Sequence, residues 1–291
     1  MKGIVLAGGS GTRLYPLTKA ISKQLLPVYD KPLIYYPIST LMLSGIRDFL
    51  IISSPRDIQA YMDLLGDGEN LGVRFSYQVQ PKPNGIAEAF IIAEDFIAKS
   101  PVALILGDNI FHGVGLGAQL RQLETTTGAQ IFAHSVRDPE NYGVIEFGLD
   151  GSVLSIEEKP KIPKSNYVVP GLYFYGSDVT QMAKRLEPSE RGELEISSLN
   201  QLYLEKGQLS VKMLDRGTAW FDTGTIDSLS DAANYVRILE ERQGSKIACP
   251  EEISWRNSWI DDRQLLQLAG SYFNTSYCDY LRQLVSNPSA F

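Results

Sequence analysis

The sequence contains little cysteine and no excess of positive charge. Its 291 residues include two cysteines, Cys249 and Cys278, which lack the spacing of a metal site and are expected to be plain packing residues. Aspartate and glutamate number 34 against 27 for lysine and arginine, so the formal net charge is -7. A nucleic-acid binder needs a concentrated basic face. The composition therefore argues against nucleic acid as a partner.

Long apolar runs are also absent. No uninterrupted stretch of about 18 apolar residues occurs, and the N-terminal apolar run at 3–7 is too short for the core of a secretory signal. We therefore expect no membrane contact and a reducing cytoplasmic location, which suits free cysteines better than a disulfide framework does. With 44% hydrophobic residues, the chain can still bury a large core.

Short apolar runs alternate with stretches of helical periodicity, which predicts an α/β fold. Helices that cover a sheet are expected at 34–45 and 85–98, where apolar residues fall on one face. Two runs around a Leu-Asp-Gly turn, 143–147 and 153–157, predict an antiparallel hairpin. The expected fold is Rossmann-like, with a mixed, mostly parallel central sheet flanked by helices. Strands of the parallel part are expected at 3–7, 49–53, 73–79 and 102–106.

The C-terminal part predicts helices without further strands. Helical patterns cover 228–242 and 261–285, and an aromatic-rich stretch at 254–259 lies between them. We therefore divide the chain into an α/β core, residues 1–227, which includes the hairpin region, and a helical C-terminal segment, residues 228–291, packed on that core.

The first expected strand leads directly into a glycine-rich loop at 8–13. Glycines let backbone N–H groups approach a phosphate because no Cβ stands in the way. The loop is not a Walker A motif, since no Gly-Lys-Ser/Thr follows, and Leu14 breaks the dinucleotide-binding fingerprint. The loop therefore predicts a phosphate cradle of another kind, with a tight connection of no further function as the plain alternative.

The residues around this loop resemble the signature of the sugar nucleotidylyltransferase family. They read LAGGSGTRLYPLT at 6–18, SKQLLPV at 22–28 and KP at 31–32. The sequence departs from the family pattern at 84–88, where Asn-Gly-Ile-Ala-Glu replaces a commoner Asp-Gly-Leu-Ala-Gln, and at Gly176, where aspartate is frequent. Further matching segments, which extend the resemblance over nearly the whole chain, are 80–81, 107–109, 142–144, 157–160, 192–195 and 220–224.

The resemblance implies a Mg²⁺-dependent nucleotidyl transfer. In the branch that this chain looks like, an oxygen of glucose 1-phosphate attacks the α-phosphorus of dTTP, which yields dTDP-glucose and pyrophosphate without a covalent enzyme intermediate. Two polyanions must meet, so the site has to supply positive charge. Arg13 and Lys23 match the family's triphosphate-binding cations, whereas composition alone would make Lys23 a solvated surface residue.

Two aspartates match the family's metal ligands. Asp108 follows the strand at 102–106, at the carboxyl edge where open α/β sheets bind ligands. Mg²⁺ prefers hard oxygen ligands and usually takes one or two carboxylates together with phosphate oxygens. The resemblance therefore implies Asp108 and Asp222 as the catalytic metal pair, although each could also be a turn-forming or capping aspartate. His112 and His134 are expected to be structural, because an ionised phosphate nucleophile needs no general base.

The remaining binding positions are implied residue by residue. An amide such as that of Gln80 can donate to and accept from a pyrimidine edge, and Gln80 and Gly85 match the family's base contacts. The nucleotide would contact Leu6, Gly8, Gly9, Ser10, Gly11, Thr12, Arg13, Lys23, Gln24, Gln80, Gly85 and Asp108. The sugar phosphate would contact Gly143, Glu158, Lys159 and Val169, although periodicity alone makes 157–159 a solvated hairpin end.

The resemblance also implies regulation. It predicts a homotetramer in dTDP-rhamnose biosynthesis, inhibited at a second site by a pathway end product such as dTDP-rhamnose. Arg216, Glu252 and Arg256 are the candidate residues, because a cation near Trp255 and Trp259 could bind a diphosphate. The plain alternative is that these aromatics seal the helical tail onto the core or onto a neighbouring subunit.

Three other functions stay open from the sequence. A uridylyl- or adenylyltransferase could use the same loop and carboxylate pair with a different base pocket. A catalytically inactive subunit that binds sugar nucleotides could keep the fold. A metal-dependent glycosyltransferase would require an Asp-x-Asp motif, for which the nearest candidate is Asp261-Asp262 in the helical tail.

Overall fold

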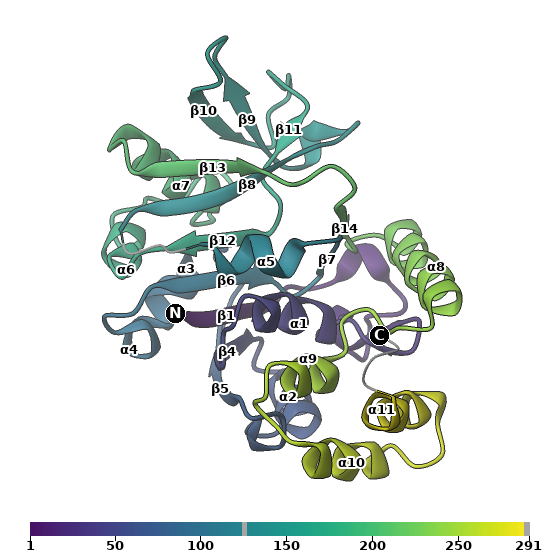
Figure 1. Cartoon of the computed structure of the whole chain (residues 1–291). Helices are drawn as coiled ribbons and strands as arrows, with labels where there is room; N and C mark the ends of the chain where they lie inside the picture. Colours follow the sequence, from purple (N-terminus) through teal and green to yellow (C-terminus); the bar gives the residue numbers. More distant parts are fainter. Residues whose placement is uncertain (124–126, 288–291) are drawn as a thin grey trace.

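The protein is described by a computed structural model that covers residues 1–123 and 127–287. Its centre is a ten-stranded sheet in the order β10-β9-β11-β8-β12-β6-β1-β4-β5, with β13 paired to β8 (Figure 1). The strands are β1 Lys2–Ala7, β4 Asp48–Ser53, β5 Arg74–Val79, β6 Val102–Leu106, β8 Ala129–Ser135, β9 Gly143–Phe147, β10 Val153–Glu158, β11 Tyr167–Val168, β12 Leu172–Tyr175 and β13 Leu209–Met213.

The sheet is mixed, as the sequence predicts. β1 pairs in parallel with β4 and β6, so that Gly3 lies between Phe49 and Ala103. These strands are nearly continuous apolar runs because both of their faces are buried. The predicted hairpin is confirmed as β9 and β10, with Phe147 opposite Val153. The antiparallel part is larger than expected, since β12 pairs antiparallel with both β6 and β8.

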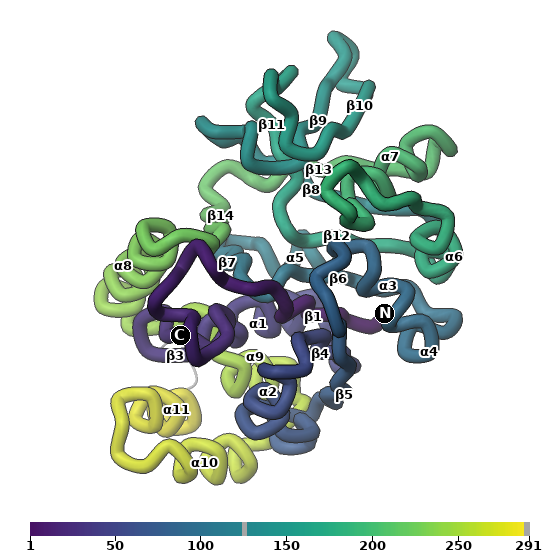
Figure 2. Tube along the Cα trace, turned by 180° about the vertical axis from the view of Figure 1, so that it is seen from behind, coloured from purple at the N-terminus to yellow at the C-terminus, as the bar shows by residue number. Residues whose placement is uncertain are grey.

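Helices cover both faces of the sheet (Figures 1 and 2). One buried cluster joins the strands to α1, α5 and α9, and a second cluster joins them to α3, α4, α6 and α7. The bounds are α1 Tyr35–Leu43, α2 Ile58–Leu65, α3 Glu88–Ile92, α4 Glu94–Ile97, α5 Leu116–Arg121, α6 Val179–Ala183, α7 Ile196–Glu205, α8 Ile226–Gln243, α9 Pro250–Arg256, α10 Asp262–Ser271 and α11 Ser276–Ser286.

The C-terminal helices pack on the core and on each other. Leu229 and Val236 of α8 pack with Val28 of the short ribbon formed by β2 Pro27–Val28 and β3 Lys31–Pro32. Cys249 and Cys278 are free and buried, as predicted, in the cluster that joins α10 and α11. Within the described ranges, no helix is both long and apolar enough to cross a membrane.

Two helical boundaries differ from the sequence prediction. The helix expected at 85–98 is broken at Ala93, whose ψ of 10° separates α3 from α4. The aromatic-rich stretch at 254–259 lies partly in α9, which begins at Pro250. Proline at the first helical position and two glutamates in the first turn favour a helix start there. Hydrophobic periodicity gave no signal for this helix because it has only seven residues.

Candidate active site

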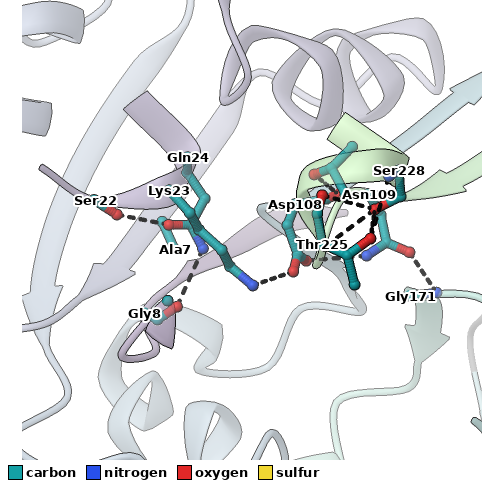
Figure 3. A network of polar contacts seen from close by, with 12 residues as sticks. Ala7, Gly8, Ser22, Lys23, Gln24, Asp108, Asn109, Gly171, Thr225 and Ser228 are labelled. Carbon is teal, nitrogen blue, oxygen red and sulfur yellow. Dashed lines mark hydrogen bonds and ion pairs between the residues drawn. The ribbon is translucent and has the colours of Figure 1, made fainter. Parts of the chain in front are cut away.

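The glycine loop is anchored by the residues that follow it. Gly9 and Gly11 have φ values of 102° and 60°, in the region that residues with a Cβ rarely adopt. Thr18 Oγ1 donates a hydrogen bond to Gly11 O at 2.6 Å. Gln24 Nε2 donates to Gly8 O at 3.1 Å, while Gln24 Oε1 accepts from Ser22 at 2.6 Å (Figure 3). The buried Gln24 amide therefore ties the loop to the segment that carries Lys23.

A second two-stranded ribbon brings the two aspartates together. β7 Asn109–His112 pairs antiparallel with β14 Ala219–Asp222, so Asp222 lies opposite Asn109. Thr223 completes the link, because its backbone N–H and its hydroxyl donate to Asp108 O at 3.1 and 2.7 Å. Asp108 and Asp222 are thus neighbours although 113 residues of sequence separate them.

Asp108 is held by two donors. The Lys23 ammonium forms an ion pair with one carboxylate oxygen, and Asn109 Nδ2 donates to the other at 3.0 Å (Figure 3). The Asn109 amide is itself fixed, because its Oδ1 accepts from Trp220 Nε1 at 2.6 Å and from Gly171 N at 3.2 Å. Burial alone would raise the pKa of Asp108, but the Lys23 ammonium and these hydrogen bonds hold the pKa below its ordinary value.

Asp222 has the opposite electrostatic balance. Burial and the neighbouring Asp108 raise the pKa of Asp222 to about 6, although Lys23 and Arg13 act against this shift. Two close carboxylates whose repulsion is only partly offset form a site for a hard cation. The described residues contain no group of three or more His, Cys, Asp or Glu arranged around a metal position. The two carboxylates by themselves fit Mg²⁺, which usually takes one or two carboxylates and completes its ligands with substrate phosphates and water.

Arg13 reaches this pair because residue 224 is glycine. A Cβ added at Gly224 would lie 2.7 Å from Arg13 Nη2 and 3.1 Å from Asp222 Oδ1. The first contact is shorter than real Cβ contacts and the second is tight, so a larger residue at 224 would require the Arg13 guanidinium to shift away from this position.

Two cavities meet at Asp108. Ile86, Leu106 and Asp108 line both cavities. Of the residues predicted from sequence, the first cavity is lined by Arg13, Asp108, Gly143, Glu158, Lys159, Val169 and Asp222. The second is lined by Leu6, Gly8, Gly9, Lys23, Gln24, Gln80, Gly85 and Asp108. The predicted sugar-phosphate residues thus line the first cavity and most of the predicted nucleotide residues line the second, but Arg13, which was predicted to bind the nucleotide, lines only the first.

A few predicted residues lie elsewhere. Ser10 lines a third cavity, which shares Gly8, Gly9 and Gln80 with the second. Gly11 and Thr12 line none of these three cavities. Sequence reasoning missed the cavity-lining residues Tyr173, Ser197 and Trp220. Trp220 is the first residue of the quoted 220–224 motif but was given no role, whereas Ser197 had no sequence signal.

The first cavity has an acidic wall with cations beside it. Ser197 donates a hydrogen bond to Glu158 Oε2, and glycine at 143 permits this, because a Cβ there would lie 2.7 Å from Ser197 Oγ. Lys159 has a left-handed φ of 43°, and its Nζ lies 3.8 Å from Glu158 Oε1. The cavity thus offers both a hydroxyl-binding carboxylate and an anion-binding ammonium.

The predicted regulatory residues are outside both cavities. Arg256 Nε donates to Glu252 Oε1 at 2.7 Å, and Glu252 Oε2 accepts from Tyr280 at 2.6 Å. Arg216 is exposed in the connection that precedes β14. No contact found in the described part of the chain joins Arg216 to the other two.

Comparison with known proteins gives the family. The model of the nucleotidyl transferase family matches residues 2–237. The glucose-1-phosphate thymidylyltransferase of Mycobacterium tuberculosis strain H37Rv is 57% identical, over 98% of this chain and 99% of its own length. The chain belongs to this family. A second family member of the same name, from Neisseria meningitidis serogroup A, is 54% identical over 98% of this chain and 99% of its own. The resemblance predicted from the sequence is confirmed.

Solved structures of the family confirm the fold. A Bacillus anthracis protein described as a glucose-1-phosphate thymidylyltransferase, solved with a sucrose, is 42% identical and superposes with a TM-score of 0.75. That match covers 81% of this chain and 95% of the other. A UDP-glucose pyrophosphorylase solved with UDP-glucose is 25% identical, with a TM-score of 0.72 over 82% of this chain and 98% of the other.

Proposed function

We propose that the protein transfers a thymidylyl group from dTTP to glucose 1-phosphate, which forms dTDP-glucose and pyrophosphate. The observation that carries this proposal is the junction of two cavities at Asp108, where an oxygen of one substrate can reach a phosphorus of the other. The names of the relatives support the choice of substrates. Holding two polyanions in one geometry supplies much of the rate enhancement in such a reaction.

In this proposal, the second cavity binds dTTP. Backbone N–H groups of the glycine loop and the side chain of Lys23 bind the phosphates, and Gln80 and Gly85 contact the base. Arg13 reaches the phosphates from the wall of the first cavity. Arg13 converges with Asp222 over Gly224, so its guanidinium lies beside the junction of the cavities. Fixed cations at that position oppose the negative charge that grows on departing pyrophosphate.

The first cavity binds glucose 1-phosphate. Glu158, oriented by Ser197, accepts hydrogen bonds from sugar hydroxyls, Lys159 binds the sugar phosphate, and Gly143 and Val169 shape the wall. Asp108 and Asp222 would hold Mg²⁺, which when bound offsets the charge of the phosphates. The attacking phosphate oxygen is already ionised, so no side chain has to remove a proton.

The test is pyrophosphate release from every pair of nucleotide and sugar phosphate, with the product identified by NMR. We expect dTTP with glucose 1-phosphate to give the highest kcat/KM. A single methyl in an apolar pocket discriminates by about 10- to 200-fold at best, so UTP should react more slowly rather than not at all. A higher kcat/KM for UTP, ATP or GTP in direct competition would refute the thymidylyl assignment.

We further propose the larger context that the resemblance implied. The protein would be a cytoplasmic homotetramer in a dTDP-sugar pathway, with residues 1–227 as the catalytic core. The helical segment 228–291 would carry a regulatory site at Glu252 and Arg256, together with Arg216. Support comes from the exposure of Arg256, which leaves its guanidinium accessible although it is paired with Glu252.

A further inference from the structure

Two buried hydroxyl groups belong to the signature at 6–32 and lie beside the glycine loop. Thr18 is 0% exposed and Ser22 is 4% exposed, and neither lines the two cavities that meet at Asp108. Neither side chain is therefore placed to contact a substrate in those cavities. Hydrogen bonds nevertheless link each of them to a backbone carbonyl of the loop, Thr18 directly and Ser22 through Gln24.

Ser22 fixes the direction of the Gln24 amide. Ser22 Oγ donates to Gln24 Oε1 at 2.6 Å, and the Tyr61 hydroxyl lies 2.7 Å from Ser22 Oγ and 3.3 Å from Gln24 Oε1. Because hydroxyl groups face the amide oxygen, the amide nitrogen is turned the opposite way, and it donates to Gly8 O at 3.1 Å (Figure 3). Gln24 is 1% exposed, so this orientation is set inside the protein. Ser22 therefore determines where the Gly8 carbonyl points.

The direction of this carbonyl decides which group the loop presents to the nucleotide cavity. The Gly8–Gly9 peptide bond is trans, and in a trans peptide the C=O and N–H groups point in opposite directions. A Gly8 carbonyl that faces the Gln24 amide thus turns the N–H of Gly9 away from it, and Gly9 lines the second cavity. Glycine on both sides makes the reversed peptide sterically accessible, because neither residue has a Cβ. Reversal would present a carbonyl oxygen, which repels phosphate.

Thr18 holds the other end of the loop. Its Oγ1 donates to Gly11 O at 2.6 Å, and Leu14 N donates to the same oxygen at 3.0 Å, so both lone pairs of this carbonyl are used inside the protein. Gly11 has a φ of 60°, and a Cβ added there would lie 3.1 Å from Thr18 Cβ, so the two residues are closely packed. The Gly11–Thr12 peptide is thus fixed directly before Arg13, which lines the first cavity.

We propose that Thr18 and Ser22 are positioning residues for the nucleotide phosphates. They hold the carbonyl groups of Gly11 and Gly8 inside the protein, so that the loop meets the phosphates with its N–H groups and with Arg13. Donors that are fixed in advance bind an anion without first having to reorganise. This inference rests on the proposed function, because that function brings the phosphates of dTTP to the glycine loop.

The experiment compares Thr18→Val and Ser22→Ala with the natural protein in steady-state kinetics. Each substitution removes one hydroxyl donor, and valine keeps the shape of threonine. We expect KM for dTTP to rise by about fivefold or more in each variant, because a buried carbonyl loses its partner and the loop is released from its binding conformation. KM for glucose 1-phosphate should stay unchanged, since its expected partners Glu158 and Lys159 do not belong to the loop. Thr18→Ser keeps the hydroxyl and should restore KM for dTTP.

The matched control is Thr180→Val. Thr180 is 5% exposed, and its Oγ1 donates to Phe90 O at 3.1 Å between α6 and α3, so the same substitution removes the same kind of buried hydrogen bond. It should lower the melting temperature, as Thr18→Val does, and leave KM for dTTP unchanged. Calorimetric titration with inorganic pyrophosphate, without the sugar substrate, should show an affinity lowered by about fivefold in Thr18→Val and Ser22→Ala but not in Thr180→Val.

The outcomes separate the inference from the proposed function. If Thr18→Val and Ser22→Ala lose stability but keep the natural KM for dTTP and the natural affinity for pyrophosphate, both residues are merely structural. The inference is then wrong and the proposed function stands. If the natural protein does not convert dTTP, the proposed function fails, and the pyrophosphate titration alone decides whether Thr18 and Ser22 position the loop.

Discussion

At the scale of single residues, the site depends on two aspartates with different surroundings. The Asp108 carboxylate pairs with the Lys23 ammonium and accepts a hydrogen bond from the Asn109 amide. Burial and the neighbouring Asp108 raise the pKa of Asp222 to about 6. This asymmetry means that Asp108 is negatively charged in the folded protein under most conditions, and that the charge on Asp222 is the one that a bound cation would stabilise.

Neutralising either aspartate should therefore abolish most of the activity. We expect Asp108→Asn and Asp222→Asn each to lower kcat by about 100-fold or more, because an amide is a poor Mg²⁺ ligand and charge stabilisation of this size is typical of preorganised sites. Without metal, Asp222→Asn should also raise the melting temperature, since it removes the repulsion from Asp108. The control is Asp215→Asn at an exposed position. Near-natural rates at saturating Mg²⁺ would remove the substituted residue from the metal site.

At the scale of elements, a buried ion network attaches the C-terminal helices to the core. Glu240 near the end of α8 accepts from Lys31 and from Lys246, each at 2.9 Å, and Ile247 N donates to it at 2.9 Å. Asp30 pairs with both lysines. The side chains of Lys31 and Glu240 are 2% and 5% exposed, so each charge needs its partners.

Removal of one member should destabilise the fold strongly. We expect Glu240→Ala to lower the free energy of unfolding by about 3 to 5 kcal/mol, because it leaves buried ammonium groups with too few acceptors. The adjacent Glu241 is 53% exposed and pairs with Arg237 one helical turn away. Glu241→Ala should cost at most about 0.5 kcal/mol. Urea denaturation measures both, and equal losses would show that the network does not stabilise the attachment.

The same network predicts a loss of stability in acid. Burial alone would raise the pKa of Asp30, but the ammonium groups of Lys31 and Lys246 lower it below its ordinary value. A carboxyl with a depressed pKa in the folded state contributes stability above its unfolded pKa and loses that contribution as the pH falls through the folded value. Urea midpoints measured from pH 7 to pH 3 should therefore fall less in Asp30→Asn than in the natural protein. Parallel curves for the two proteins would contradict this assignment.

At the scale of the whole molecule, the catalytic and regulatory proposals occupy different parts. The cavities lie at the end of the sheet where Asp108 follows β6. Glu252 and Arg256 lie on α9, whose Ile253 packs in the same buried cluster as α1. An effector bound near α9 can change activity only if it binds one conformational state more tightly than another.

A true second site should therefore give inhibition that substrates cannot fully relieve. We expect dTDP-rhamnose to inhibit even at saturating dTTP and glucose 1-phosphate, and Arg256→Ala to weaken this inhibition by about 5-fold or more while uninhibited turnover is retained. Arg263→Ala, at an exposed residue of α10, is the control. Strictly competitive inhibition that is unchanged in Arg256→Ala would place the inhibitor in the active site alone.

The sequence by itself determined the local features of this protein. The glycine loop, the parallel strands and the β9–β10 hairpin follow from short-range patterns, because backbone conformation and burial periodicity are properties of neighbouring residues. Charge and cysteine content likewise argued against nucleic-acid binding and a disulfide framework without any knowledge of contacts. The signature at 6–32 gave the family, and the candidate residues of the two cavities came with it.

Only the tertiary structure decided how distant residues meet. The pairing of β7 with β14 places Asp222 beside Asp108, and no periodicity encodes a contact between strands that lie so far apart in the chain. The same holds for the hydrogen bond from Ser197 to Glu158 and for the one from Trp220 to Asn109. Even Ser22 and Gln24, which are close in sequence, required the structure, because the direction of an amide is fixed by the donors and acceptors that surround it in space.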